Sequence, residues 1–428
     1  MSQIAPLSTD SLQQWLNYWT TVHVTAIDLG LERVLPVAHA LNVLKPQAKI
    51  FTVAGTNGKG STTSTLANIL QSAGYQVGLY QSPHIIRFNE RIRINGIEIS
   101  DQALIDAFVQ VEQARQQCEL TLSFFEATTL AALLIFKQQL CDVWVLEVGL
   151  GGRLDVVNII DPDVAVITNI GLDHVDWLGD SIEKIAFEKA GIIRSNIPVI
   201  FAGNQELPQA IADKIAECQA SLFQYQKDYD FQINSENWYL AMPALTMALP
   251  HGHLAHINQS AAIMAALVSD LNITQTAIET ALEHTRLAGR FEQRYYKKHH
   301  LILDVAHNPH GVAFLTQQLT RYLQLNPEIT QVNAVFSMLE DKDIDGVIEL
   351  LTNIVNKWYI APLNVYRAAS IERLQQALNG YNVKVSDNIQ YSFQIALRES
   401  EEHQLILVCG SFHTLEAVWE CLLHGDEQ

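Results

Sequence analysis

The sequence predicts an α/β fold of two domains, each built on a mostly parallel sheet with helices on both faces. Three observations lead to this prediction. Short apolar runs rich in β-branched residues alternate with helical segments in two separate blocks, which is typical of βαβ units. Most of these runs end in loops rich in glycine and polar residues. A polar stretch that contains several arginines and lysines, residues 283–300, separates the two blocks.

The first block supplies the predicted elements of the larger, N-terminal domain. Residues 50–54 form an apolar run that leads into a glycine-rich turn, and residues 61–73 have helical character up to Gly74. Residues 143–148 and 164–168 are further apolar runs, and residues 123–140 have the length and composition of a helix. Strands buried on both faces give such continuous apolar runs, so we expect one mostly parallel sheet.

The second block begins near residue 295 and predicts a smaller, Rossmann-like α/β domain. Residues 301–306, 332–337 and 405–409 are predicted strands, and helices are expected near residues 311–323, 344–354 and 412–423. Each strand is followed by a helix, as in right-handed βαβ units. We place the domain boundary in the polar stretch, which gives domains of residues 1–292 and 293–428.

Composition excludes several classes of protein. The 428 residues include 46 acidic and 27 basic side chains, a net charge of −19, and 48% are hydrophobic. A disordered chain is excluded, and the acidic balance argues against binding to a nucleic-acid duplex. Five scattered cysteines indicate neither a disulfide framework nor a zinc site. Neither a secretory signal nor a run of about 18 apolar residues occurs. We expect a cytoplasmic enzyme or switch, without a membrane partner.

The glycine-rich turn predicts a nucleotide site. Its residues are Gly55, Thr56, Asn57, Gly58, Lys59, Gly60 and Ser61. Such a turn points backbone N–H groups at an anion, the following helix adds its positive end, and Lys59 can reach the β- and γ-phosphates. The pattern departs from G-x-x-x-x-G-K-[ST], because Val53 replaces the first glycine and Gly60 follows the lysine. The order of strand, loop, lysine, hydroxyl and helix still favours ATP or GTP, so the N-terminal domain is predicted to be P-loop ATPase-like.

This loop and a series of further segments resemble the Mur ligase superfamily, and within it the bacterial bifunctional dihydrofolate synthases/folylpolyglutamate synthases. The segments follow one another along nearly the whole chain. They are I-D-L-G-L-E-R-V at 27–34, S-P-H at 82–84, F-N-E-R at 88–91, F-E-A-T-T at 125–129, L-E-V-G-L-G-G-R-L-D at 146–155, G-L-D-H at 171–174, E-K-A-G-I at 188–192, G-R-F at 289–291 and D-V-A-H-N-P at 304–309.

The resemblance implies an ATP-dependent ligase that joins L-glutamate to 7,8-dihydropteroate and to reduced folates through an acyl phosphate. It assigns ATP and the pterin to the Mur-ligase-like N-terminal domain and names the C-terminal domain a glutamate ligase domain. It implies Mg²⁺, with two ions expected and a monovalent cation left open, and it favours a monomer. A close rival is a Mur-type ligase acting on cell-wall peptide precursors. The segments at 27–34 and 82–91 argue against it, because they resemble folate enzymes.

A metal site is predicted beside the phosphate loop. Glu147 ends an apolar run beside three glycines, and a buried carboxylate there needs a partner such as Mg²⁺. By itself His174 is more typical of a structural hydrogen-bonding residue than of a Mg²⁺ ligand. The resemblance assigns Ser61, Glu147 and His174 to the metal, and it implies that Lys189 is carbamylated and holds a second ion. Lys59, Lys189 and His174 are the predicted catalytic residues.

The resemblance also implies the substrate-binding residues. It assigns dihydropteroate to Ile27, Asp28, Leu29, Gly30, Ser82, Pro83, His84, Arg91, Phe125 and Asp155. An aromatic ring at Phe125 can pack on a flat pterin, although core packing explains it equally well, and Asp155 can accept hydrogen bonds from pterin N–H groups.

More distant segments are predicted to reach ATP. The resemblance assigns Arg290, Asp304 and His307 to its phosphates or to the facing side of the nucleotide, and Asn258 with Gln259 to the region of adenine. The histidines at 251, 253 and 256 suggest a metal, but without acidic neighbours they are better explained by a solvated loop. A GTPase switch has little support, since the only N-K pair, Asn356-Lys357, lacks the aspartate of N-K-x-D.

Overall fold

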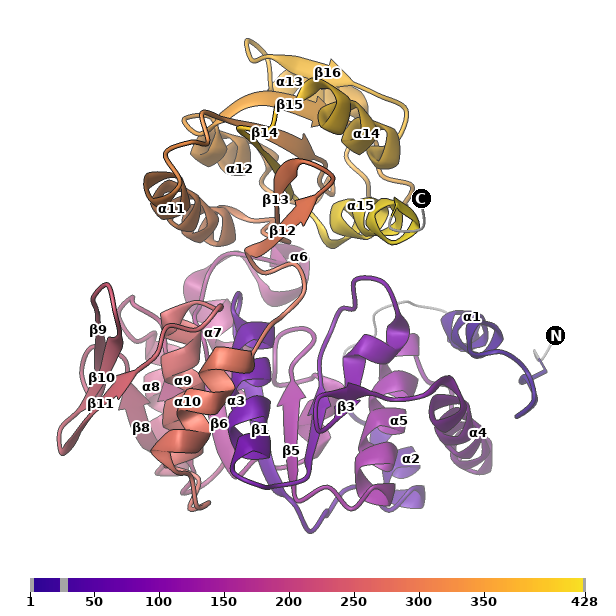
Figure 1. The fold of residues 1–428 in the computed structure, drawn as a ribbon. Coiled ribbons are helices and arrows are strands. Elements are labelled where there is room, and N and C mark those ends of the chain that lie inside the picture. The colour runs from indigo at the N-terminus through magenta and orange to yellow at the C-terminus, as the bar shows by residue number, and fades with distance from the viewer. Residues whose placement is uncertain (1–3, 24–29, 426–428) are drawn as a thin grey trace. The chain divides into compact units, whose positions relative to one another are not determined.

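The computed structural model describes residues 4–23 and 30–425, and the chain divides into two compact units, one up to Arg286 and one from Leu287 on (Figure 1). Each unit is a sheet with helices on both faces, which confirms the predicted fold class. Within the described ranges, no helix is both long and apolar enough to cross a membrane.

The first unit contains an eight-stranded sheet in the order β4-β3-β2-β5-β1-β6-β7-β8. All neighbouring strands are parallel except β2-β3 and β3-β4. The bounds are β1 Lys49–Ala54, β2 Val77–Tyr80, β3 Ile92–Ile94, β4 Ile97–Glu98, β5 Val143–Glu147, β6 Val164–Ile167, β7 Pro198–Phe201 and β8 Ser221–Gln224. The predicted strands β1, β5 and β6 form the centre of this sheet, and their carboxyl ends therefore meet at one edge.

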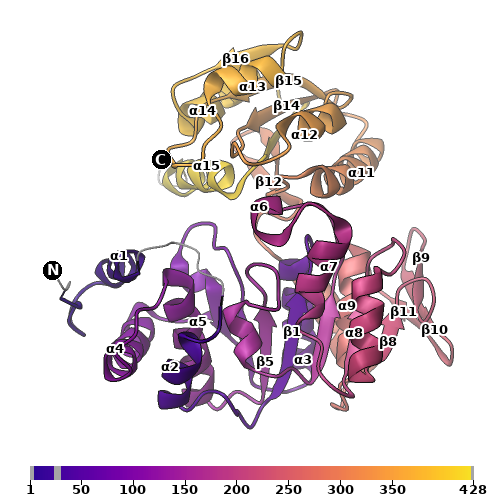
Figure 2. The ribbon, with the colours of Figure 1, turned by 180° about the vertical axis from the view of Figure 1, so that it is seen from behind.

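Side chains of the central strands alternate between two apolar cores. Phe51 and Val53 point to one core, whereas Ile50 and Ala54 point to the other. Helices α3, α9 and α10 cover the first face (Figure 1), and α7 and α8 lie on the opposite face (Figure 2), which α1, α2, α4 and α5 also cover. The bounds are α1 Leu12–Val22, α2 Val34–Ala40, α3 Lys59–Ser72, α4 Asp101–Gln117, α5 Phe124–Gln138, α7 Ile182–Ala190, α8 Gln209–Cys218, α9 His256–Leu267 and α10 Gln275–His284.

Several elements of this unit were not predicted. Helix α1 begins at a Ser11 capping box and buries Trp15 and Trp19 against Phe108 of α4. A separate antiparallel sheet has the order β11-β10-β9. The remaining elements are the helix α6 Val175–Leu178, the 3₁₀ helices η1 Phe88–Arg91 and η2 Val156–Ile159, and the strands β9 Asp230–Ile233, β10 Trp238–Met242 and β11 Leu245–Leu249.

The second unit contains a six-stranded sheet in the order β12-β13-β17-β14-β15-β16, parallel except for β12. Helices α11, α12 and α13 bury their apolar sides in one core, while α14 and α15 contact the strands from the other side. The bounds are β12 Glu292–Tyr296, β13 His299–Leu303, β14 Gln331–Phe336, β15 Val355–Ile360, β16 Val383–Val385, β17 Gln404–Cys409, α11 Pro309–Leu325, α12 Ile344–Leu351, α13 Ile371–Ala377, α14 Ile389–Glu399 and α15 Phe412–Gly425.

Candidate active site

The glycine-rich turn joins the carboxyl end of β1 to the first turn of α3. Gly55 has φ +150°, and a Cβ there would lie 1.8 Å from the Thr168 hydroxyl oxygen. Gly58 has φ +83°, and its Cβ would lie 2.3 Å from Oδ1 of Asn258. Both positions therefore need glycine, for the backbone conformation and for the close approach of a neighbour. The second contact places Asn258, a predicted ATP residue at the start of α9, directly on this turn.

Hydrogen bonds fix the turn to the segment that follows β6. The Thr56 N–H donates to the Asn169 carbonyl at 3.0 Å, and the Asn57 N–H donates to Oδ1 of Asn169 at 3.0 Å. The Thr168 hydroxyl donates to the Asn57 carbonyl at 2.6 Å. The turn is thus preorganised, and the first N–H groups of α3, which have no acceptor within the helix, can bind an anion.

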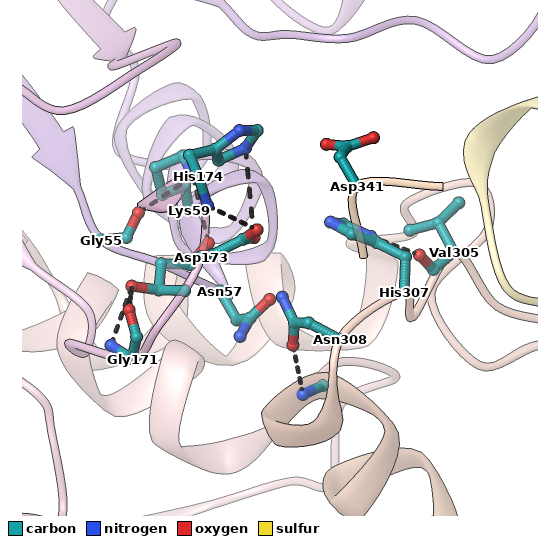
Figure 3. Close-up of polar contacts among 12 residues, drawn as sticks. Gly55, Asn57, Lys59, Gly171, Asp173, His174, Val305, His307, Asn308 and Asp341 are labelled. Carbon is teal, nitrogen blue, oxygen red and sulfur yellow. Dashed lines mark hydrogen bonds and ion pairs between the residues drawn. The ribbon is translucent and has the colours of Figure 1, made fainter. Parts of the chain in front are cut away.

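Two lysines converge on one carbonyl of this turn. Lys59 Nζ donates to the Gly55 carbonyl at 3.0 Å (Figure 3), and Lys189 Nζ donates to the same oxygen at 3.1 Å. Lys189 is 4% exposed. Burial, reinforced by the neighbouring Lys59 charge, lowers the pKa of Lys189 to about 7. Lys189 is therefore a buried lysine and not a solvated surface residue.

Two predicted metal residues lie next to the glycine-rich turn. Ser61 is the last residue of the turn, Glu147 ends the neighbouring strand, and both side chains are 4% exposed. Glu147 ends β5, where its Cα pairs with that of Val53 on β1. Among the residues the structure describes, no three His, Cys, Asp or Glu side chains gather to hold a metal ion. The Glu147 carboxylate and the Ser61 hydroxyl fit Mg²⁺ bound beside a nucleotide. Mg²⁺ is typically held by one or two carboxylates together with substrate phosphates.

His174 lies at the start of α6 in the left-handed conformation, with φ 51°. Its Nε2 is 4.0 Å from Oδ2 of Asp173, and its side chain is 39% exposed (Figure 3). Asp173 in turn raises the pKa of Lys189 against the larger effect of burial. Lys59, Lys189, Asp173 and His174 are thus neighbours on the same edge of the sheet, and the metal role of His174 stays a prediction.

The predicted substrate segment 82–91 forms a compact loop between β2 and β3. The Arg91 Nε donates to Nδ1 of His84 at 2.8 Å, and its guanidinium lies 5.2 Å from the Phe88 ring centroid. Burial lowers the pKa of Arg91, while Tyr80 and Glu147 oppose the shift. Arg91 is thus electrostatically linked to Glu147, the predicted metal residue. Ser82 and Pro83 are joined by a cis peptide bond at the start of this loop.

Phe125 and Asp155 lie on either side of the loop after β5. The Phe125 ring is half-buried, 6.3 Å from the Tyr80 ring, and a Cβ on Gly149 would lie 2.5 Å from Phe125 Cζ. The Asp155 carboxylate accepts hydrogen bonds from the N–H groups of Gly149, Leu150 and Val157 at 2.9–3.0 Å. Burial nevertheless raises the pKa of Asp155 to about 6. Asp155 therefore organises this loop, a role that sequence reasoning missed.

The first substrate segment is described only in part. Ile27, Asp28 and Leu29 lie outside the described residues, and Gly30 is the first residue of this segment within them. Arg33 follows and donates from Nη2 to Oε1 of Glu126 at 2.7 Å. Glu126 is 1% exposed, and its other oxygen accepts the Ser123 N–H in the capping box of α5. Sequence reasoning missed this ion pair, although both residues belong to the quoted motifs.

The three predicted residues of the second unit gather at the carboxyl end of β13. Asp304 accepts the N–H groups of Phe291 and Ala306 at 2.7 and 2.8 Å, and burial raises its pKa against the effect of Arg290. The Arg290 guanidinium lies 5.3 Å from the Phe412 ring centroid. His307 Nδ1 is 2.9 Å from the Val305 carbonyl (Figure 3).

The histidines near α9 belong to an aromatic cluster. His251 Nδ1 lies 3.2 Å from His256 Nε2, and the His256 ring contacts Trp238 edge-on at 5.2 Å. His251 and His256 are half-buried, so the expected solvated loop is in part packed. Gln259, the other residue assigned to the adenine region, is fully buried in α9.

The fold and the phosphate loop are those of a nucleotide-dependent enzyme. Comparison with known proteins identifies the protein class. The Mur ligase middle domain model matches residues 53–240, and the model of the Mur ligase glutamate ligase domain matches residues 289–412. The chain is therefore built as a Mur ligase, a class of ATP-dependent ligases.

Relatives at higher identity narrow this class. The dihydrofolate synthase/folylpolyglutamate synthase of Escherichia coli strain K12 is 42% identical over 418 residues, which cover 97% of each chain. The structure of E. coli FolC in complex with DHPP and ADP superposes with a TM-score of 0.93 at 41% identity, covering 99% of this chain and 100% of that one. A bifunctional folylpolyglutamate synthase/dihydrofolate synthase with Mn, AMPPNP and L-glutamate bound gives 0.91 at 41%, covering 98% and 100%.

The chain belongs to the dihydrofolate synthase/folylpolyglutamate synthase family, as its motifs predicted. Members of this family are ATP-dependent ligases, and the chain is an enzyme of this kind.

Proposed function

We propose that the chain joins L-glutamate to 7,8-dihydropteroate and, in polyglutamylation, to reduced folates. The observation that carries this proposal is the convergence, at one sheet edge, of the phosphate loop after β1, the 82–91 loop after β2 and Glu147 at the end of β5. An ATP phosphate and an acid substrate held there would meet beside the same carboxylate. The family name of the relatives and the DHPP and L-glutamate in their structures support the choice of substrates.

The reaction proceeds in two displacement steps. A carboxylate oxygen of the acid attacks the γ-phosphorus, the bond to the bridging oxygen breaks, and ADP leaves. The amine of glutamate then attacks the acyl carbon, inorganic phosphate leaves with the bonding electrons, and the amine nitrogen loses a proton. Two anions meet in the first step, so Lys59 and the N–H groups at the start of α3 serve to offset their repulsion and the charge developing on the phosphoryl oxygens.

Ser61, Glu147 and His174 would hold Mg²⁺, and Lys189, once carbamylated, would hold a second ion. A divalent cation supplies further charge neutralisation to the phosphates. The lowered pKa of Lys189 supports carbamylation, because only a neutral amine attacks CO₂. The second ion and a monovalent cation are part of this proposal.

For substrate binding we propose that Phe125 packs on the pterin. Asp155 already accepts three backbone hydrogen bonds, and a carboxylate has about four lone-pair directions, so one remains for a pterin N–H group. Asp304 and His307 are proposed to contact ATP from the glutamate ligase domain, Arg290 to contact its phosphates from the domain junction, and Asn258 to lie near its adenine. We further propose that the enzyme is a cytoplasmic monomer with domains at residues 1–292 and 293–428.

A phosphate-release assay tests the function. Purified enzyme receives ATP, Mg²⁺ and L-glutamate, together with 7,8-dihydropteroate, a reduced folate or a UDP-muramoyl peptide in separate reactions. We expect release with the first two acids only. Release with the peptide alone would replace the folate assignment by the peptide-ligase alternative.

A further inference from the structure

Gln81 is the first residue after β2 and has no role in the function described so far. Its side chain is 6% exposed. The preceding residue, Tyr80, pairs with Leu146 of β5, so Gln81 lies next in line at the sheet edge that carries Glu147. It also directly precedes Ser82, the first residue of the 82–91 loop. A buried amide at the end of an apolar strand requires polar partners.

The amide nitrogen of Gln81 is bound to the first turns of α3. Nε2 donates to the Gly60 carbonyl at 2.9 Å, and it lies 2.8 Å from the Thr63 hydroxyl and 3.0 Å from the Ser64 hydroxyl. Gly60 belongs to the phosphate loop and separates Lys59 from Ser61. A shift of this turn when it binds phosphate therefore acts directly on the Gln81 side chain.

Two other polar groups of Gln81 are bound to Arg91, at the far end of the 82–91 loop, and to Arg93 in the adjoining strand β3. Its backbone N–H donates to the Arg91 carbonyl at 2.9 Å, and its Oε1 accepts a hydrogen bond from Arg93 Nη1 at 3.3 Å. The loop between these ends is itself held together, because the Glu90 carboxylate accepts the N–H groups of Ile85, Ile86 and Arg87 at 2.6–2.9 Å. The loop is thus braced internally by Glu90 and joined to Gln81 at its far end.

We infer that Gln81 is a positioning residue that couples the phosphate loop to the 82–91 loop, so that nucleotide bound at α3 sets the position of the acid substrate. The assignment of the acid to this loop rests on the function proposed above. A glutamine meets the need because one side chain supplies both a donor for Gly60 and an acceptor for Arg93. Coupling between two sites is typically worth about a 5- to 150-fold change in affinity.

Hydrogen–deuterium exchange with Mg²⁺ and AMPPNP tests the coupling without any acid substrate. In the wild-type enzyme the nucleotide should slow exchange both at residues 55–64 and at residues 82–91. Gln81→Met keeps the size of the side chain but has no donor and only a weak acceptor, so slowing should persist at 55–64 and disappear at 82–91. With the acid present, KM for the acid should rise at least about 5-fold while KM for ATP changes little.

Gln76→Met is the matched control, because Gln76 precedes β2 at its other end and donates from Nε2 to the Gln139 carbonyl. In Gln76→Met, the nucleotide should slow exchange at residues 82–91 as it does in the wild type. Arg93→Met removes the donor to Gln81 Oε1 and should likewise abolish the slowing at residues 82–91. It provides the test if Gln81→Met does not fold.

If Gln81→Met and Arg93→Met slow exchange at 82–91 as much as the wild type does, or if the wild type shows no slowing there, the inference is overturned. Transmitted slowing in a wild-type enzyme that releases no phosphate with either pterin acid would leave the coupling standing and remove the proposed substrate.

Discussion

The side-chain amines of Lys59 and Lys189 donate hydrogen bonds to the same acceptor, the carbonyl oxygen of Gly55, at 3.0 and 3.1 Å. Two ammonium groups on one oxygen repel each other, and the charge of Lys59 indeed contributes to the lowered pKa of Lys189. The Gly55 carbonyl thus joins Lys59, expected to bind phosphate, to Lys189, expected to be modified. A change at either lysine should therefore alter the environment of the other.

Substitution Lys59→Met is expected to lower kcat about 10²–10³-fold, as the loss of one preorganised donor to a developing anion typically does. The enzyme should stay folded, since Lys59 is only half-buried at the start of α3. Phosphate release with saturating acid and glutamate measures the effect. Lys49→Met is the control, because Lys49 begins the same strand β1 at its opposite end. A Lys59→Met enzyme as fast as Lys49→Met would contradict the proposed role.

Carbamylation of Lys189 is expected to depend on pH around its pKa of about 7. The neutral amine attacks CO₂ and releases a proton, giving a carbamate anion. Below pH 7 the amine is protonated and cannot react, so the modified fraction should fall as pH decreases from 8 to 6. Carbon NMR of enzyme equilibrated with ¹³C-labelled bicarbonate measures the carbamate, with Lys189→Met as the blank. A wild-type spectrum without the carbamate at pH 8 rules out this modification under the conditions used.

Patterns local in sequence predicted the central elements of the fold. The apolar run 50–54, the following glycines and the helix ending at Gly74 were visible because strand burial, tight turns and helix ends each depend on a few adjacent residues. Helix α1 was missed, since its Trp15 and Trp19 are explained only by Phe108, about 90 residues away in the chain. Strand β12 was missed because it lies at a sheet edge with three consecutive exposed residues, Gln293, Arg294 and Tyr295, and therefore lacks an apolar run.

Substitution Glu147→Gln is expected to remove most of the divalent-metal binding. It replaces the only predicted carboxylate ligand by an amide of the same size, and Mg²⁺ strongly prefers charged oxygen ligands. Paramagnetic resonance of Mn²⁺ titrated into the enzyme with ADP reports the free ion, whose signal should persist in the variant. The phosphate loop remains intact, so ADP binding without metal serves as the control. Unchanged Mn²⁺ affinity would exclude Glu147 as a ligand.

The motifs named many of the residues at the site but not the contacts that hold them. Asp155 was noticed for its charge, yet its three backbone partners depend on how the loop 149–157 folds. Lys189 was assigned to the site only through the family resemblance, and its burial follows only from the packing of α7 against the phosphate loop. Gln81 and Glu126 were overlooked because glutamine and glutamate are common at protein surfaces, and only the structure shows them buried.

The Arg33–Glu126 ion pair gives a prediction about the acid substrate. The pair joins the end of the 27–34 segment to the first turn of α5, which carries Phe125. Glu126→Gln keeps an acceptor for Arg33 but loses the charge, and charge-assisted hydrogen bonds contribute about 1.5–3 kcal/mol. If that energy positions the two segments, KM for dihydropteroate should rise roughly 10-fold, while KM for ATP stays near the wild-type value. Steady-state kinetics with each substrate varied in turn gives both constants.

Stability provides the second readout for this pair. Glu126→Ala leaves Arg33 without its carboxylate, and breaking a fully buried pair costs about 3–5 kcal/mol. The Arg33 side chain is 26% exposed, so water offsets part of this cost and the loss should be smaller. Glu112→Gln is the matched control, because Glu112 is another buried carboxylate paired with an arginine, Arg115, on α4. It should lower the melting temperature without changing KM for dihydropteroate. Should both Gln variants shift KM alike, the Arg33–Glu126 pair supports the fold in general and has no particular part in placing the acid.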